Sequence, residues 1–344
     1  MNPLIWALLI TSLSTSTVIT MSSNHWLLAW LGLELNTLSI IPIIAKPNHP
    51  RATEAAMKYF LMQATGATLI LCATTINAWQ TGQWTMTCTL SPTATTLLTA
   101  AIALKLGLAP AHLWYPEVMQ GSTPTTALII STWQKIAPLT LLMMTHNHLN
   151  TNTLLTLGIT SAVLGGLTGL NQTQTRKIMA FSSIAHMGWL ITTLTLNLTL
   201  TTLTMITYIL MTSTMFYTLA TTSSKTLSDM GTTWSLSPTL TTTTMLALVS
   251  LGGLPPLTGF MPKWLILKDL VTAPLPSTLL LLTSLPSLFF YTRLAYLATL
   301  TTPPTTTNTE HTWRLPTRYT PMMTLMASTT LLLLPITPLL YHTT

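Results

Sequence analysis

The feature that most constrains this sequence is how rarely a charged residue interrupts it. Only 6% of the 344 residues are Asp, Glu, Lys or Arg, and 49% are hydrophobic. A soluble domain carries about 25% charged residues, which it needs to cover its surface against water. Much of the remaining polarity is Thr, Ser and Asn, whose side chains can bond to the carbonyl groups of their own helix in lipid. The sequence therefore predicts a membrane-integral protein.

Long apolar stretches divide the chain into about eleven candidate membrane spans, each needing about 20 residues. They cover residues 3–21, 25–45, 57–79, 94–116, 124–145, 151–171, 178–196, 199–222, 238–272, 275–298 and 321–342. The ninth is too long for one straight helix. The segment 299–320 is expected to be an extended loop, because it contains Pro303, Pro304 and clustered Thr. The expected fold is an all-α polytopic membrane protein with a single membrane domain over 1–344.

The basic residues of the expected loops fall on one side of the membrane. If consecutive spans alternate in direction, the loop Lys and Arg residues all share the side of the N-terminus. They are Lys46, Arg51, Lys58, Arg176, Lys177, Lys225, Arg314 and Arg318. The loops on the opposite side carry neither Lys nor Arg. Because basic loops stay on the inner side, the N-terminus is expected in the cytoplasm or the mitochondrial matrix.

Five ionisable side chains lie near the centres of expected spans instead of in loops. They are Glu34, Lys105, Lys135, His186 and Lys263. A charged residue at the bilayer centre costs about 2.5–3.5 kcal/mol on insertion scales, so such residues are usually functional. One interpretation is that Glu34 pairs with a lysine and ties helices together, but this leaves two lysines without a carboxylate. We expect the lysines to bind and release protons, whereas His186 fits a relay role and a packing role equally well.

Two spans contain proline and glycine near a lysine. One reads KLGLAPAHLWYPEVMQG and begins at Lys105, and the other reads LGGLPPLTGFMPKW and contains Lys263. Proline cannot donate a backbone hydrogen bond and breaks a helix. The residues expected to interrupt these helices are Pro110, Gly253, Pro255 and Pro256. Backbone freed at membrane depth must pack in protein or line a cavity, and a matched pair of broken helices is typical of a transport site.

The two broken spans also predict an internal repeat. They are the fourth and the ninth, and an odd offset gives the two halves opposite topology, as in inverted-repeat transporters. The first repeat is expected over 1–145 with the broken span 94–116. The second is expected over 151–298 with the broken span 238–272, followed by the loop and a C-terminal span over 321–342.

Two polar residues follow the first break. His112 could extend a polar path from Lys105 toward the side of the N-terminus. A bond between its ring and the carbonyl groups freed near Pro110 explains it equally well. Glu117 is expected at the membrane surface as an interfacial or interhelical partner.

The sequence argues against several other kinds of site. The two cysteines form no CxxC pattern and are too few for an iron–sulfur cluster held by this chain. No GxGxxG or GxxxxGK[ST] motif supports nucleotide binding. The net charge of +7 is spread over single or paired residues, so nucleic acid is not an expected partner. We therefore expect no catalytic residue, cofactor site or metal site on this chain.

Five stretches of the sequence resemble a known family. They read SSNHWLLAWLGLELNTLSIIP, RATEAAMKYFLMQATGA, KLGLAPAHLWYPEVMQG, GLNQTQTRKIMAFSSIAHMGW and LGGLPPLTGFMPKW. They resemble the antiporter-like proton channel family, which is related to Mrp-type sodium/proton antiporters and includes NADH–ubiquinone oxidoreductase chain 2 of mitochondrial respiratory complex I. The resemblance extends to about residue 300 and is less clear beyond it.

The resemblance implies roles for four residues. The family's key glutamate matches Glu34, its broken-helix lysine Lys105, its central lysine Lys135, and its second broken-helix lysine Lys263. A proton path is implied in which Glu34 modulates a lysine, Lys105 and Lys135 pass the proton, and Lys263 leads it onward or outward.

The resemblance also implies a setting for the chain. This is a core membrane subunit of complex I, a proton-translocating NADH:ubiquinone reductase, in the mitochondrial inner membrane beside the other membrane subunits. The N-terminus would face the matrix and the C-terminus the intermembrane space. NAD, FMN, iron–sulfur clusters and ubiquinone are expected on other subunits and not on this chain. Two alternatives stay open, namely a stand-alone cation/proton antiporter and a subunit that only anchors its neighbours.

Overall fold

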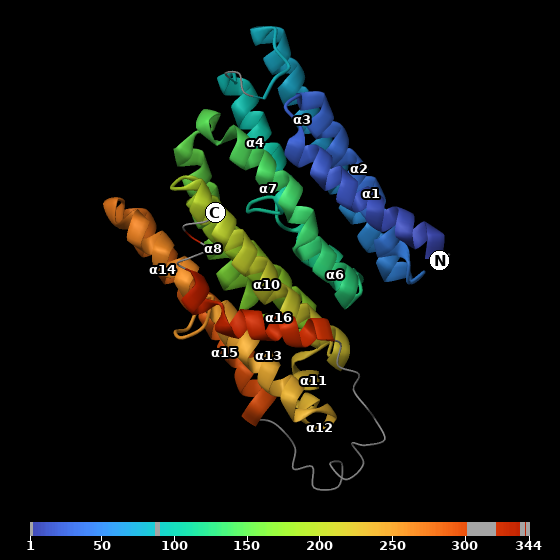
Figure 1. The fold of residues 1–344 in the computed structure, drawn as a ribbon, viewed down its shortest axis with the longest axis vertical. Coiled ribbons are helices and arrows are strands. Elements are labelled where there is room, and N and C mark those ends of the chain that lie inside the picture. The colour runs from blue at the N-terminus through green and yellow to red at the C-terminus, as the bar shows by residue number, and fades with distance from the viewer. Residues whose placement is uncertain (1–2, 87–89, 301–320, 338–340, 342–344) are drawn as a thin grey trace. The chain divides into compact units, whose positions relative to one another are not determined.

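The computed structural model describes residues 3–86, 90–300, 321–337 and 341. Within these ranges the regular elements are helices, with two isolated bridges between single residues, so the predicted all-α fold is confirmed (Figure 1). The chain divides into two compact units, Met1–Ser161 and Ala162–Thr344. The loop expected over 299–320 lies outside the described residues from position 301 onward.

Among its described residues, the first unit contains seven α-helices, one short 3-10 helix and the start of α8. They are α1 (Pro3–Ser22), α2 (Trp26–Ala45), α3 (Pro50–Thr81), α4 (Pro92–Leu106), α5 (Trp114–Gly121), α6 (Pro124–Ser131), α7 (Trp133–Thr145), the short η1 (His146–His148) and α8 (Thr151–Gly169). Helices α1, α2 and α3 run side by side, and α3 also packs against α4 and α5 (Figure 1). Helix α3 therefore contacts both arms of the first broken span.

The second unit continues from the end of α8. Its elements are α9 (Thr175–Leu194), α10 (Leu198–Thr222), α11 (Leu227–Gly231), α12 (Thr233–Leu236), α13 (Pro238–Gly252), α14 (Phe260–Asp269), η2 (Leu270–Thr272), α15 (Pro274–Leu300), α16 (Pro321–Leu332) and η4 (Leu334–Ile336). Helix α13 packs against α10, α15 and α16, and α14 also contacts α10. Helix α10 therefore contacts both arms of the second broken span.

Proline and glycine set the boundaries of several helices. Ser91 and Thr123 each accept a hydrogen bond from a backbone N–H of the following first turn, where Pro92 and Pro124 stand at its start. Helix α3 ends at Thr81 and is capped by Gly82, whose φ of 72° is left-handed and suits a residue without a Cβ.

Six helical segments within the described residues are long and apolar enough to cross a membrane by length and composition. They are Pro3–Ser22, Trp26–Ala45, Pro50–Thr81, Pro124–His148, Leu198–Thr222 and Pro274–Leu300. The other expected spans are broken, shorter or more polar, so the full number of spans stays a prediction.

Hydroxyl side chains inside the helices bond to their own backbone. Thr192 and Thr193 of α9 each donate to the carbonyl oxygen three residues earlier at 2.6 Å. Ser161 of α8 does the same at 2.8 Å. This bonding allows polar residues to lie in apolar surroundings, which explains how a Thr-rich chain forms membrane helices.

The fourth expected span is interrupted around Pro110. Helix α4 ends at Leu106, Gly107 follows with a φ of 71°, and α5 begins at Trp114. The peptide bond between Ala109 and Pro110 is cis. The chain between the two arms is a turn, so this span is discontinuous as expected.

The ninth expected span is interrupted in the same manner. Helix α13 ends at Gly252, Gly253 has a φ of 79°, and α14 begins at Phe260. The peptide bond between Pro255 and Pro256 is cis.

The two arms of this second break touch each other through their backbones. A Cβ added at Gly259 would collide with the carbonyl oxygen of Ser250. Only glycine therefore allows the start of α14 to approach the end of α13 this closely.

The span expected over 124–145 has a break that the sequence did not predict. Helices α6 and α7 meet at Thr132, whose hydroxyl donates to the Leu128 carbonyl oxygen at 2.7 Å. Pro138 inside α7 cannot donate to the carbonyl oxygen of Gln134, four residues earlier. The helix therefore lacks one backbone hydrogen bond just after Thr132. The break places Lys135 in the first turn of α7.

Candidate functional site

Lys105 occupies the last turn of α4, immediately before the first break. The residue is 5% exposed, and its aliphatic chain lies over Gly66 of α3, where an added Cβ would be 2.9 Å from Lys105 Cγ. The amide of Gln63 donates to the Lys105 carbonyl oxygen at 3.2 Å, which ties α4 to α3. Within the described residues the Lys105 ammonium has no hydrogen-bond partner.

Glu34 of α2 is the carboxylate whose charge acts on Lys105. It is half-buried, and its buried Oε2 has no hydrogen-bond partner in the part of the chain that the structure describes. Among the described residues, the ion pairs do not include one between Glu34 and Lys105.

Lys135 lies on α7 beside a polar network. It is 3% exposed, and its ammonium is 4.9 Å from the centroid of the Tyr115 ring, a cation–π contact. The neighbouring Gln134 accepts a hydrogen bond from the Tyr59 hydroxyl at 3.2 Å and donates to Asn36 Oδ1 at 3.1 Å. This network joins α3, α7 and α2 around the lysine.

Lys105 and Lys135 line the same small cavity, which we call the inner cavity. Tyr59, Gln63 and Gln134 supply further polar groups to its wall. The centre of a water molecule can occupy ≈ 10 Å³ there, which is room for about one water. Two buried amines from different helices therefore face one polar, water-sized space.

His112 lies in the turn between α4 and α5. It is 6% exposed, and its Nδ1 is 3.2 Å from the carbonyl oxygen of Pro110. The ring thus bonds to a carbonyl oxygen that the break frees, which was one of the two interpretations of His112. Its role in a polar path stays a prediction.

Lys263 lies in the first turn of α14 in the second unit. Its ammonium donates to the Gly252 carbonyl oxygen at 2.9 Å and lies 5.8 Å from the centroid of the Trp189 ring. A Cβ added at Gly253 would be 3.0 Å from Lys263 Nζ. The ammonium therefore caps the C-terminus of α13, where the helix dipole favours a positive charge.

His186 of α9 lies among tyrosine side chains of the second unit. Its Nε2 is 3.3 Å from the hydroxyl of Tyr291 on α15, and its ring centroid is 5.7 Å from that of Tyr208 on α10. The half-buried histidine thus belongs to a hydrogen-bonded aromatic cluster.

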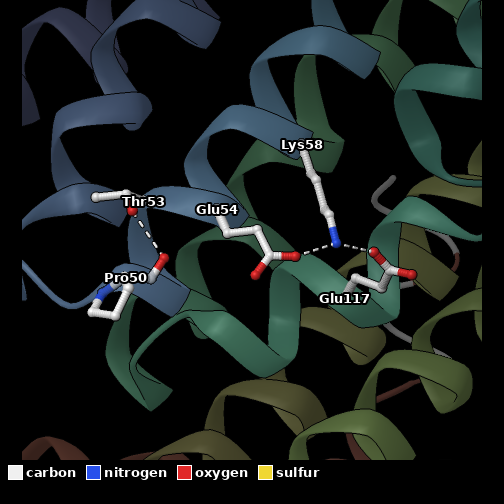
Figure 2. A network of polar contacts seen from close by, with 5 residues as sticks. All are labelled: Pro50, Thr53, Glu54, Lys58 and Glu117. Atoms are coloured by element: carbon white, nitrogen blue, oxygen red, sulfur yellow. Dashed lines mark hydrogen bonds and ion pairs between the residues drawn. The ribbon is translucent and has the colours of Figure 1, made fainter.

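An ion-pair cluster lies at the surface of the first unit (Figure 2). Lys58 of α3 contacts Glu54 one turn earlier at 2.5 Å and Glu117 of α5 at 2.6 Å. The side chains are between 40% and 60% exposed. Glu117 is thus an interhelical partner, as the sequence suggested, and Lys58 is its cation.

The structure adds residues that the sequence did not single out. Tyr59, Gln63, Gln134 and Asn36 complete the polar wall and network around the two lysines. A weak signal existed, because Gln134 adjoins a central lysine and Asn36 follows two residues after the central glutamate. The pairing of Tyr59 with a residue 75 positions away has no signal in a single sequence.

The predicted site residues divide between the two units. Glu34, Lys105 and Lys135 gather in the first unit, whereas His186 and Lys263 belong to the second. The proposed lateral line through all five stays a prediction. Among the residues whose structure is described, no group of three His, Cys, Asp or Glu side chains is placed to hold a metal.

Two family models match this chain. The model described as NADH:quinone oxidoreductase/Mrp antiporter, TM, matches residues 23–290. The model described as NADH dehydrogenase subunit 2 C-terminus matches residues 288–341. The second match covers the segment in which the sequence resemblance is less clear.

Individual proteins match over nearly the whole length. NADH-ubiquinone oxidoreductase chain 2 of Carassius auratus is 53% identical over 341 residues, covering 98% of each chain. The protein of the same name from Struthio camelus is 51% identical over 342 residues, covering 99% of each chain. A chain in the structure of respiratory complex I from Thermus thermophilus with bound aureothin is 27% identical, with a TM-score of 0.83 over 97% of this chain and 80% of that one.

Proposed function

Because this chain belongs to the NADH-ubiquinone oxidoreductase chain 2 family of respiratory complex I, we propose that its buried lysines carry protons through the membrane. The chain is a multi-pass membrane subunit of complex I and works beside the other membrane subunits of that assembly. It is thereby part of an enzyme that couples NADH oxidation by ubiquinone to proton pumping.

The inner cavity is the observation that carries this proposal. Lys105 and Lys135 come from different helices, are both buried, and face one polar space with room for about one water. Buried amines are costly for structure alone, because each must be desolvated. Two of them around one water-sized space are suited to passing a proton.

The proposed transfer in the first unit moves one proton and no electrons. The ammonium of one lysine releases a proton to water in the inner cavity, and that water protonates the neutral amine of the other lysine. Glu34 is proposed to modulate this transfer, because a carboxylate favours a proton on a nearby amine. The polar groups of Tyr59 and Gln134 hold the water in position.

The second unit is proposed to continue the path. Lys263 sits at the second break, where its proton is held by the Gly252 carbonyl oxygen. His186 would relay protons through the tyrosine hydroxyl that contacts its ring. His112 would extend the path of the first unit toward the membrane surface.

We further propose in which membrane the chain lies and that other subunits hold the cofactors. One-sided loop Lys and Arg residues support a matrix N-terminus in the mitochondrial inner membrane, with the C-terminus in the intermembrane space. Because the chain has 2 cysteines and no nucleotide motif, NAD, FMN, iron–sulfur clusters and ubiquinone are assigned to other subunits.

Substitution of Lys105 by Met in the assembled complex tests the proposal. Met retains the length and apolar body of the side chain but cannot bind a proton. Proton translocation into sealed vesicles should fall by about tenfold or more, as expected when a positioned proton donor is removed. The matched control is Lys46→Met, because that lysine lies against the Trp6 ring and not in the inner cavity.

The experiment also separates the two alternatives. Normal pumping in Lys105→Met with normal assembly would show that the lysine is structural and that the chain only anchors its neighbours. Proton exchange by the isolated chain in the absence of NADH would favour a stand-alone antiporter.

A further inference from the structure

The two broken spans share a sequence register. Residues 107–117 and 253–263 both fit the pattern G-L-x-P-x-x-x-[WF]-x-P-[EK]. Their local structures agree, because both patterns begin with a left-handed glycine, with φ of 71° and 79°, and a helix begins at the aromatic position in both. In this register Glu117 of the first unit stands where Lys263 stands in the second.

The shared register indicates a role for Glu117 beyond its ion pair with Lys58. The same position beyond the break carries an ionisable side chain in both units, a carboxylate in one and an amine in the other. Since Lys263 is a proposed proton carrier, its counterpart Glu117 is a second candidate carrier.

Glu117 lies in a groove that we call the outer groove. Its walls are Lys58, Leu61, Met62, Leu113, Trp114 and Glu117, and its volume is about 310 Å³. Trp114 lines both the outer groove and the inner cavity. Trp114 is thus a residue that the two spaces share.

The position of Trp114 favours contact between these spaces. The residue is 6% exposed, and its ring packs edge-on against Tyr59 and Tyr115, with centroids 5.9 and 5.5 Å away. Its buried Nε1–H has no hydrogen-bond partner among the described residues. An unpaired buried N–H costs about 1–3 kcal/mol, so binding a water or a carboxylate oxygen would stabilise this donor.

The charge balance of the ion-pair cluster suits a carboxylate that changes protonation. Lys58 contacts two carboxylates, and Arg51 also acts on Glu54 by its charge. If Glu117 accepts a proton, Lys58 keeps its partner Glu54 and is not left without a counter-charge. Lys58 therefore has a second carboxylate, on its own helix, besides the one on α5.

We propose that Glu117 and Trp114 form the port through which the inner cavity exchanges protons with water at this face. The proposal rests on the proposed function of the lysines. The Glu117 carboxylate takes a proton from a hydronium ion in the water of the outer groove and becomes a carboxylic acid, leaving a neutral water. It then gives that proton to a water that lies beside Trp114 between the two spaces, and this water protonates the neutral amine of Lys105, so that the carboxylate is regenerated and an ammonium forms.

The test compares Glu117→Gln with Glu54→Gln in the assembled complex. Both carboxylates contact the same Lys58, but only Glu117 lines the outer groove, so the second variant controls for loss of an ion pair. We expect Glu117→Gln to slow proton translocation about tenfold, and Glu54→Gln, which leaves the proton-binding Glu117 in place, to slow it by much less. Glu117→Asp should restore most of the rate, because it can bind a proton.

Equal rates in the two Gln variants, or failure of Asp to restore the rate, would overturn the port. If Glu117→Gln does not assemble, Trp114→Phe decides, because Phe keeps the ring packing and lacks the N–H. That variant should slow translocation several-fold with normal assembly, and an unchanged rate would refute the proposal. Lys105→Met, measured in parallel, distinguishes failure of the port from failure of the proposed function.

Discussion

Replacing Gly253 by Ala should disturb Lys263 in two separable ways. At a φ of 79° a residue with a Cβ costs about 1–2 kcal/mol more than glycine. The new Cβ would also lie 2.9 Å from Lys263 Cδ and 3.0 Å from its Nζ. Carbon atoms pack at about 3.5–4.0 Å, so the lysine side chain must retreat by about 0.5–1 Å.

The retreat of Lys263 removes its hydrogen bond to Gly252, which is 2.9 Å long. A hydrogen bond from a charged donor contributes about 1.5–3 kcal/mol. Together with the backbone cost, Gly253→Ala should destabilise this region by about 2.5–5 kcal/mol. Proton translocation should fall several-fold, because the proton on Lys263 loses the carbonyl group that holds it.

Gly82→Ala is the matched control for this experiment. Gly82 has a φ of 72°, but a Cβ there would meet no atom within 4 Å, so it carries the backbone cost alone. Both variants are assayed for proton translocation in vesicles and for heat inactivation of the assembled complex. The reasoning is refuted if the two variants translocate protons equally, since only the contact with Lys263 separates them.

The remaining predictions concern other parts of the chain. Glu34→Gln should leave the complex assembled but slow pumping, because the lysine of α4 loses its counter-charge; pumping equal to that of the unmodified complex would contradict this. Gly66→Ala should lower pumping by displacing the same lysine, whose Cγ would be 2.9 Å from the new Cβ. Gln134→Leu leaves two buried polar partners unpaired at about 1–3 kcal/mol each, which heat inactivation of the complex should detect. The backbone N–H groups of Thr226 and Lys225 donate to the Asp229 carboxylate and hold its pKa below its usual range. The loop is therefore stabilised at neutral pH, and it loses this stabilisation as the pH falls through the lowered pKa of Asp229. Limited proteolysis across that range checks the effect, and Asp229→Asn should remove the pH dependence.

The sequence predicted both broken helices because their cause is local. Pro110 lacks an N–H whatever surrounds it, and so do Pro255 and Pro256. The centres of the apolar stretches likewise identified Lys105 and Lys135, since a charge at that depth is visible from spacing alone.

The break at Thr132 was not visible in the same way. It depends on a hydroxyl that bonds to its own helix and on a proline six residues later, and either feature alone is common in a continuous helix. The polar wall of the inner cavity was also missed. Tyr59 and Asn36 meet Gln134 only because α3, α2 and α7 pack together, and packing between distant segments has no local signal.

The contact between Gly259 and Ser250 has a mechanical consequence for the second broken span. Two arms joined only by a turn could bend like a hinge, but arms in backbone contact have no side chain between them that could yield. The two arms are therefore expected to move together, so that a displacement of α14 also displaces α13. Lys263 stands on α14 and is bonded to the end of α13, so its hydrogen bond is expected to survive a joint displacement of the two arms.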